Sequence, residues 1–150
     1  MDDDSKQIIE SMAVVEDKIM ELYAVFSDKF PMDASLWSKL SQEEKMHAGM
    51  IRTLGDMIRS QDVKFQKDRF NLKSLQNLVL RLSDEIQKAT NNFFNRKSAL
   101  EFALKLEQTL VEKKSFEAFE SDIADMKKLF GILMQETQKH AKEIQDYMVR

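Results

Sequence analysis

The two histidines of this 150-residue chain, His47 and His140, lie in segments that resemble each other. When residues 40–48 are aligned with residues 133–141, Leu, Gln, Glu, His and Ala recur at the same positions, so both histidines occupy one position of an internal repeat. In the first copy Glu44 precedes the histidine by three residues, which places both side chains on one face of a helix. Carboxylate and imidazole groups are ligands for iron, manganese or zinc. The repeat therefore predicts a metal site.

Three glutamates are predicted to face the protein interior. On a helix, the neighbours of residue i are residues i±3, i±4 and i±7. Glu16, Glu44 and Glu107 have mainly apolar residues at these positions, whereas the corresponding neighbours of other glutamates are polar or charged: Glu10, Glu21, Glu101 and Glu112. An ionised carboxylate in an apolar face costs several kcal/mol unless a cation compensates it. A metal ion would compensate all three, and the predicted metal ligands are Glu16, Glu44, His47, Glu107 and His140.

Each of these glutamates could instead lie at the edge of an apolar stripe, with its oxygens in water. That alternative explains one residue well, but not five that fit a known ligand arrangement, in which two helices supply a Glu and two others supply Glu-x-x-His. Glu43 and Glu136 lie one helical step outside this arrangement, and we expect them to be outer partners or solvated. Tyr23 and Tyr147 each follow a predicted ligand by seven residues. We interpret both as core tyrosines, with hydrogen bonding near the site as the alternative.

The composition favours long helices that could position these ligands. The chain has 3 Gly, 1 Pro and no Cys, and 33% of its residues are charged. Few helix-breaking residues and many charged ones are typical of an all-α protein, and the length fits a single domain over residues 1–150. The absence of Cys excludes disulfides, thiolate zinc sites and iron–sulfur clusters.

Charge and hydropathy restrict the partners and the location. A net charge of -3 without a basic stripe argues against nucleic acid. No apolar run reaches the roughly 18–20 residues of a membrane span. The acidic start, residues 1–4, is unlike a signal peptide. We therefore expect a cytoplasmic protein with no membrane contact.

Apolar residues spaced three and four apart predict the helices. The expected ranges are about 5–30, 34–63, 72–90, 98–119 and 121–148. Pro31 should end the first helix, and the predicted helix-starting residues are Asp33, then Ser98 in a capping box with Glu101, and finally Ser121 or Asp122. The predicted fold class is all-α: a ferritin-like four-helix bundle, in which two antiparallel helical hairpins are joined by a long crossover containing an extra helix.

Three stretches of the chain, together with His140, resemble the rubrerythrin and bacterioferritin branch of the ferritin-like family. The stretches are residues 15–23, 40–47 and 99–107, and with the crossover the resemblance covers nearly the whole chain. It implies a di-iron carboxylate site that binds two irons through the five predicted ligands. It also implies an oxidoreductase, of peroxidase or ferroxidase type, that reduces peroxide or dioxygen or oxidises Fe(II). Manganese or zinc are alternative metals for the same ligands.

The sequence departs from the family at two points. Thr137 stands where the family has a carboxylate that helps to hold both metals, and there is no Cys-rich rubredoxin-like domain to supply electrons. The missing charge could be replaced by hydroxide, water or another anion, or by Glu136 if a π-bulge shifts the helix. Alternatively, the site holds one metal ion or none.

Two functions therefore stay open. One is a rubrerythrin-like iron-binding oxidoreductase, and the other is a non-catalytic ferritin-like scaffold or interaction protein with a relict or structural metal site. Thr137 favours the second. The resemblance also implies a homodimer or larger homo-oligomer and, for an active enzyme, an electron-donor protein.

Overall fold

The computed structural model describes residues 1–61, 72–120 and 123–150, and between residues 114 and 120 it describes the backbone alone. In these parts the chain is all-α, as the composition predicts, and contains five α-helices and one short 3₁₀ helix. The elements are α1 (Asp3–Lys29), η1 (Pro31–Asp33), α2 (Ala34–Met57), α3 (Leu72–Thr90), α4 (Arg96–Glu120) and α5 (Ala124–Met148). None of the helices in the described residues carries an apolar stretch long enough to cross a membrane.

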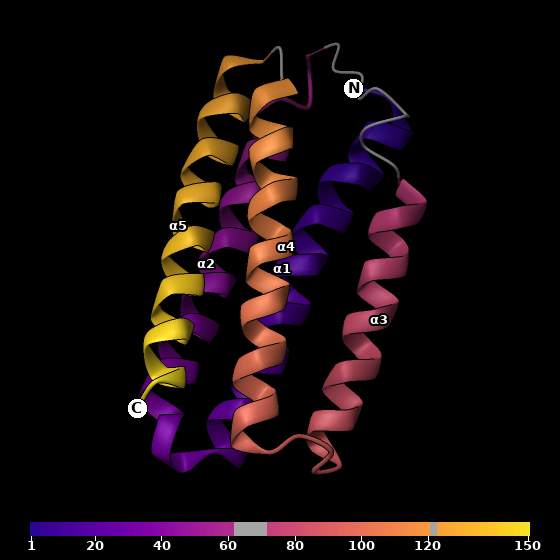
Figure 1. Cartoon of the computed structure of the whole chain (residues 1–150). Coiled ribbons are helices and arrows are strands. Elements are labelled where there is room, and N and C mark those ends of the chain that lie inside the picture. Colours follow the sequence, from indigo (N-terminus) through magenta and orange to yellow (C-terminus); the bar gives the residue numbers. More distant parts are fainter. Residues whose placement is uncertain (62–71, 121–122) are drawn as a thin grey trace.

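The helices lie side by side along one long axis (Figure 1). The main packing pairs are α1 with α2 and α4 with α5, while α3 packs on α1 and α2 contacts α5. Each of the two main pairs is antiparallel, and α3, which follows α2 in the chain, runs back along the molecule on the outer side of α1 (Figure 1). The interior enclosed by α1, α2, α4 and α5 therefore receives side chains from both halves of the sequence.

The first helix has a buried face at the spacing that its sequence predicts. Ile8, Met12, Val15 and Ile19 are all at most 5% exposed. The helix begins at Asp3, before the predicted start near residue 5, because the side chain of Asp2 accepts a hydrogen bond from the Ser5 amide at 2.8 Å. It ends before the proline, as predicted.

The second helix ends earlier than predicted. It stops at Met57, not near Val63, and Ile58 follows as its C-cap. Ile58 is the last buried residue of this segment, and residues 59–61 are exposed, so a longer helix would gain no packing. Residues 62 and 63 lie outside the described part. Asp33 stands at the predicted N-cap position, but its side chain makes no capping hydrogen bond.

The turn between α3 and α4 sets where both helices stop and start. Asn92 has a positive φ of 62°, and the amides of Asn92 and Phe93 bond the carbonyls of Ala89 and Lys88 at 3.2 and 2.9 Å, which is a Schellman motif. The predicted box of Ser98 with Glu101 is wrong, since α4 already starts at Arg96.

The capping box of α4 lies three residues earlier in the chain. The Asn95 side chain accepts from the Ser98 amide at 2.8 Å, while the Ser98 hydroxyl accepts from the Asn95 amide at 3.0 Å. Serine thus takes the role that Glu or Gln usually has at the third helical position. The other predicted caps, Ser121 and Asp122, lie outside the described residues, and α5 has Ile123 at its N-cap position.

Candidate metal centre

All five predicted ligands are buried in the interior shared by four helices. Their exposed fractions are 1% for Glu16, 0% for Glu44, 3% for His47, and 0% for both Glu107 and His140. Glu16 comes from α1, Glu44 and His47 from α2, Glu107 from α4 and His140 from α5. The neighbour rule on a helix face therefore identified glutamates that are truly interior.

Each ligand is held by the apolar stripe in which it lies. Glu16 stands between the buried Met12 and Ile19 on α1. On α2, Leu40 and Ile51 are buried on either side of the Glu44–His47 pair. These side chains fix the helices against one another, and they exclude water from the carboxylates and imidazoles that lie between them.

The ligand atoms form two overlapping groups. Glu16, Glu44 and His47 each offer one atom within 4.8 Å of the others, and so do Glu44, Glu107 and His140. Glu44 belongs to both groups, so its carboxylate lies between two positions that a metal ion could occupy. The imidazole rings of His47 and His140 are nearly parallel, at 17°, with centroids 5.5 Å apart.

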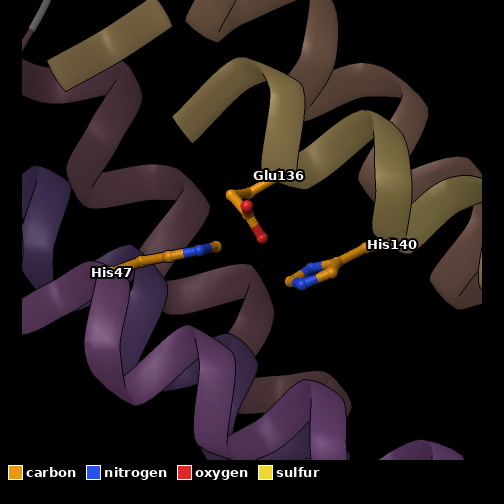
Figure 2. Close-up of side chains that lie close together, drawn as sticks. All are labelled: His47, Glu136 and His140. Atoms are coloured by element: carbon orange, nitrogen blue, oxygen red, sulfur yellow. The ribbon is translucent and has the colours of Figure 1, made fainter. Parts of the chain in front are cut away.

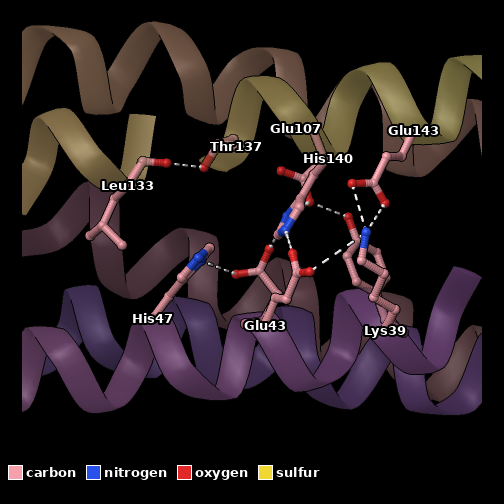
Figure 3. A network of polar contacts seen from close by, with 10 residues as sticks. Lys39, Glu43, His47, Glu107, Leu133, Thr137, His140 and Glu143 are labelled. Carbon is pink, nitrogen blue, oxygen red and sulfur yellow. Dashed lines mark hydrogen bonds and ion pairs between the residues drawn. The ribbon is translucent and has the colours of Figure 1, made fainter. Parts of the chain in front are cut away.

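His140 makes close contacts through both ring nitrogens. Its Nδ1 lies 3.0 Å from Glu44 Oε1 and 3.6 Å from Glu107 Oε1, whereas its Nε2 lies 2.6 Å from Glu43 Oε2. On the other histidine, Nδ1 of His47 lies 3.3 Å from Glu44 Oε2. Figure 3 shows these contacts converging between α2 and α5.

The carboxylates around His140 change its acidity. Burial alone lowers the pKa of this imidazole, but interactions with Glu107 and Glu44 outweigh burial and raise the pKa to about 11. In the metal-free protein His140 is therefore an imidazolium at neutral pH, and both of its N–H groups donate to carboxylates. Its positive charge then lies beside the carboxylates of Glu44 and Glu107.

Tyr23 joins the site from α1. The tyrosine is fully buried, and its hydroxyl donates a hydrogen bond to Glu107 Oε1 at 2.7 Å. Burial, followed by the charges of Glu107 and Glu44, raises the pKa of Tyr23 well above its usual value. It is a core residue that also bonds a predicted ligand, so both interpretations of Tyr23 apply. Tyr147 is instead half-buried and packs against the edge of the core, with its exposed hydroxyl 3.4 Å from Ser35 Oγ.

A chain of charged side chains connects His140 with the surface. Glu43 is 22% exposed and lies 3.8 Å from the Lys39 ammonium, which donates to both oxygens of Glu143 at 3.0 and 2.9 Å (Figure 3). Of the two roles predicted for Glu43, the outer partner is the one found. Because Glu43 accepts from Nε2, it turns the Nδ1 of His140 toward Glu44 and Glu107.

On α5, Thr137 stands where α2 has Glu44, three residues before the histidine, and Glu136 precedes it. The Thr137 hydroxyl donates to its own helix, to the Leu133 carbonyl at 2.7 Å. Glu136 is half-buried, and its carboxylate approaches both histidines, with one atom each of His47, Glu136 and His140 within 4.8 Å of the others. Since α5 is α-helical throughout Ala124–Met148, no π-bulge is required.

The approach of Glu136 to both histidines without a π-bulge was not predicted, because its sequence neighbours are mixed. Residues Ile132, Leu133 and His140 suggest a buried face, but Lys139 and Glu143 suggest a solvated one. Its position four residues before His140 was the signal that could have identified it, because residues i and i+4 share a helix face.

No protein-family model, curated protein or solved structure matches this chain.

Proposed function

We propose that this chain is a ferritin-like, rubrerythrin-type protein that binds two iron ions in its interior. The observation that carries the proposal is the pair of buried ligand groups that share Glu44. A carboxylate common to two metal positions is what a dinuclear centre requires, and carboxylates with imidazoles are a suitable donor set for Fe(II) and Mn(II). The ligands would be Glu16, Glu44, His47, Glu107 and His140.

The helix arrangement supports the same assignment. The antiparallel pairs α1–α2 and α4–α5, with α3 in the connection between them, agree with two helical hairpins joined by a long crossover. In such a four-helix bundle the metal is held by side chains from facing helices, as these ligands are arranged. The internal repeat around His47 and His140 relates the two hairpins.

The residues around the site have separate roles in this proposal. Two bound Fe(II) ions would supply the electrons that reduce dioxygen or peroxide, and would themselves be oxidised to Fe(III). Tyr23 holds the Glu107 carboxylate through its hydroxyl, and Glu43 orients the His140 ring. These outer partners fix ligand geometry and raise ligand basicity.

A small pocket beside Glu16 favours a small substrate. Apolar side chains form most of its wall, among them Met12, Val15, Ile51 and Leu133. It holds about 20 Å³, room for a single small molecule, since one water requires roughly 10–15 Å³. Dioxygen or peroxide fits such a space.

Anaerobic reconstitution tests the proposal. The metal-stripped protein is loaded with Fe(II), metal per chain is measured by elemental analysis, and peroxide is then added while the near-ultraviolet spectrum is recorded. We expect about two irons per chain and a new oxo–iron absorption. Protein without bound iron, or iron without any spectral change after peroxide, would contradict the redox function.

One observation favours a second function, that of a non-catalytic scaffold. The His140 imidazolium already bonds Glu44 and Glu43, so part of the buried charge is compensated without metal. Thr137 likewise satisfies its hydroxyl within α5. A bundle with these internal contacts could keep its shape with a relict or structural metal site.

The substitution His47→Ala separates the two functions. For a metal-binding protein it should lower both the bound metal and the melting temperature of the loaded protein, because a ligand is lost. For a scaffold it should leave metal content unchanged and alter stability little, or increase it by removing a buried polar group.

A further inference from the structure

A third group of ligand atoms lies on the side of the site that faces the α2–α5 contact. Figure 2 shows the carboxylate of Glu136 extending from α5 into the space between His47 and His140. One atom of each residue lies within 4.8 Å of the other two, and both histidines are buried whereas Glu136 is half-buried. We call this the outer group, and the two groups that share Glu44 the inner groups.

The outer group is close to the geometry of a metal site. In a tetrahedral site, ligands bound at about 2.1 Å to one ion lie about 3.4 Å apart. The three atoms lie within 4.8 Å of one another, so side-chain movements of at most about 1.4 Å would bring them to this separation. Two helices that already pack on each other supply the residues, so the backbone is in place before metal binds.

The composition of the outer group differs from that of the inner groups. It has two imidazoles and one carboxylate, whereas each inner group has two carboxylates and one imidazole. A His₂Glu set with an open fourth position is a common zinc arrangement, and nitrogen-rich sites bind Zn²⁺ more tightly than Fe²⁺ or Mn²⁺.

We propose that His47, Glu136 and His140 form an additional metal position, distinct from the inner groups, that binds Zn²⁺ in preference to Fe²⁺. Glu136 replaces the carboxylate that Thr137 cannot supply, but from the outer side of α5. The inner groups and the outer group share the histidines but have different glutamates, so the choice of metal decides which glutamates are engaged. This proposal does not require the inner groups to hold iron.

Two glutamates separate the metal positions experimentally. Glu136 belongs to the outer group alone, and Glu44 belongs to both inner groups but not to the outer one. Metal-stripped full-length protein is titrated with Zn²⁺ against a chromophoric chelator, and in parallel with Fe²⁺ without oxygen, for the wild type, Glu136→Gln and Glu44→Gln. Asp146→Asn, which removes the same charge from an exposed position of α5, is the matched control.

We expect Glu136→Gln to weaken Zn²⁺ binding by more than the roughly 10–100-fold that outer partners of a metal ligand contribute, while Fe²⁺ binding is retained. Glu44→Gln should show the reverse, and Asp146→Asn should match the wild type. The proposal is overturned if Glu136→Gln binds Zn²⁺ like the wild type, or if Glu44→Gln abolishes Zn²⁺ binding while Glu136→Gln does not. Circular dichroism of each metal-free variant verifies its fold.

The same data distinguish this proposal from the proposed function. If the wild type does not bind Fe²⁺ but binds Zn²⁺ in a manner that depends on Glu136, the proposed iron-binding function is rejected and the proposed zinc position is retained. Two irons per chain, with Zn²⁺ binding unaffected by Glu136→Gln, would do the opposite.

Discussion

At the scale of single residues, His140 determines how the buried carboxylates are balanced in the absence of metal. It is fully buried, and its ring nitrogens lie 3.0 Å from Glu44 and 2.6 Å from Glu43. A buried carboxylate without a cation is costly, and a proton on this imidazole provides one. A metal ion that bound this histidine would therefore compete with the proton.

The stability of the metal-free protein should fall as the pH rises. In the folded protein the pKa of His140 is about 11, against an ordinary value of 6.5. Folding thus favours the imidazolium, and its contribution to the free energy of unfolding is complete below pH 6.5 and is lost between pH 6.5 and about 11. Urea denaturation with a chelator present, at pH 6 to pH 9, would measure this slope.

His140→Gln provides the control for that slope. It should reduce the free energy of unfolding at pH 6 by about 3–5 kcal/mol, because Glu44 and Glu107 lose their cation. It should also flatten the decrease with pH. Parallel profiles for the variant and the wild type would show that another group causes the pH dependence.

Tyr23 is the second residue whose removal should be costly. Its hydroxyl is the donor to Glu107 Oε1, at 2.7 Å in a fully buried setting. Tyr23→Phe should lower the free energy of unfolding by about 1–3 kcal/mol, because a buried acceptor loses its partner. The Tyr147 hydroxyl makes only an exposed 3.4 Å contact. Tyr147→Phe should therefore lower the free energy of unfolding by less than about 0.5 kcal/mol. Equal costs in chemical denaturation would contradict this role of Tyr23.

At the scale of helices, an ion pair and a hydrogen bond connect the start of α4 with two other elements. Arg96 pairs with the buried Asp33 of η1, with Nε 2.7 Å from Oδ2, and it donates to the Tyr147 carbonyl of α5 at 3.2 Å. One guanidinium therefore connects the hairpin α1–α2 with both helices of the second hairpin, near the end where the chain turns from α3 into α4 (Figure 1).

Breaking this ion pair should destabilise the protein measurably. Arg96→Ala leaves Asp33, which is 3% exposed, without its cation. Since the Arg96 side chain is 36% exposed, water offsets part of the loss, and we expect a cost of about 1–3 kcal/mol. Arg59→Ala breaks a pair with Asp56 that is about 70% exposed at both ends, and should change stability by less than about 0.5 kcal/mol. Thermal melts of both variants would compare them.

Sequence periodicity predicted the helices well where a buried stripe supports them. The ranges 72–90 and 34–57 agree with the expected ones at their starts, and α3 also ends as expected, since Asn91 and Asn92 form its C-terminal turn. The end of α2 was misplaced because the polar residues after Ile58 still fit a helical pattern. The start of α4 was misplaced because Ser98–Glu101 matches the common box, whereas Asn95 with Ser98 does not.

The interior glutamates were predictable for the same reason. Glu16, Glu44 and Glu107 interrupt otherwise apolar faces, and a face of this kind must be buried. Glu136 could not be assigned in this way because it lies at the boundary of the buried face, where its position depends on the partner helix. The contact of Arg96 with Asp33 joins residues 63 apart, and no local pattern encodes it.

At the scale of the whole molecule, the candidate site connects the two halves of the chain. The inner groups take Glu16, Glu44 and His47 from α1 and α2, and Glu107 and His140 from α4 and α5. In the described residues, the two halves contact each other mainly through α2 and α5, and this contact is less extensive than the packing within each hairpin. A metal ion bound by residues of both halves would therefore strengthen the contact between the halves, which is the less extensive one.

Metal binding should consequently stabilise both hairpins together. At a free metal concentration 100 times the dissociation constant, the free energy of unfolding should rise by about 2.7 kcal/mol, and amide hydrogen exchange should slow in α1 and α2 as well as in α4 and α5. Anaerobic Fe²⁺-loaded and chelator-treated protein would be compared by hydrogen exchange and by urea denaturation. Glu44→Gln should lose the effect, since both inner groups need this residue, whereas Glu101→Gln on the exposed face of α4 should keep it. Slower exchange in one hairpin alone would mean that the metal is held by that half, and that the two halves are joined by packing without it.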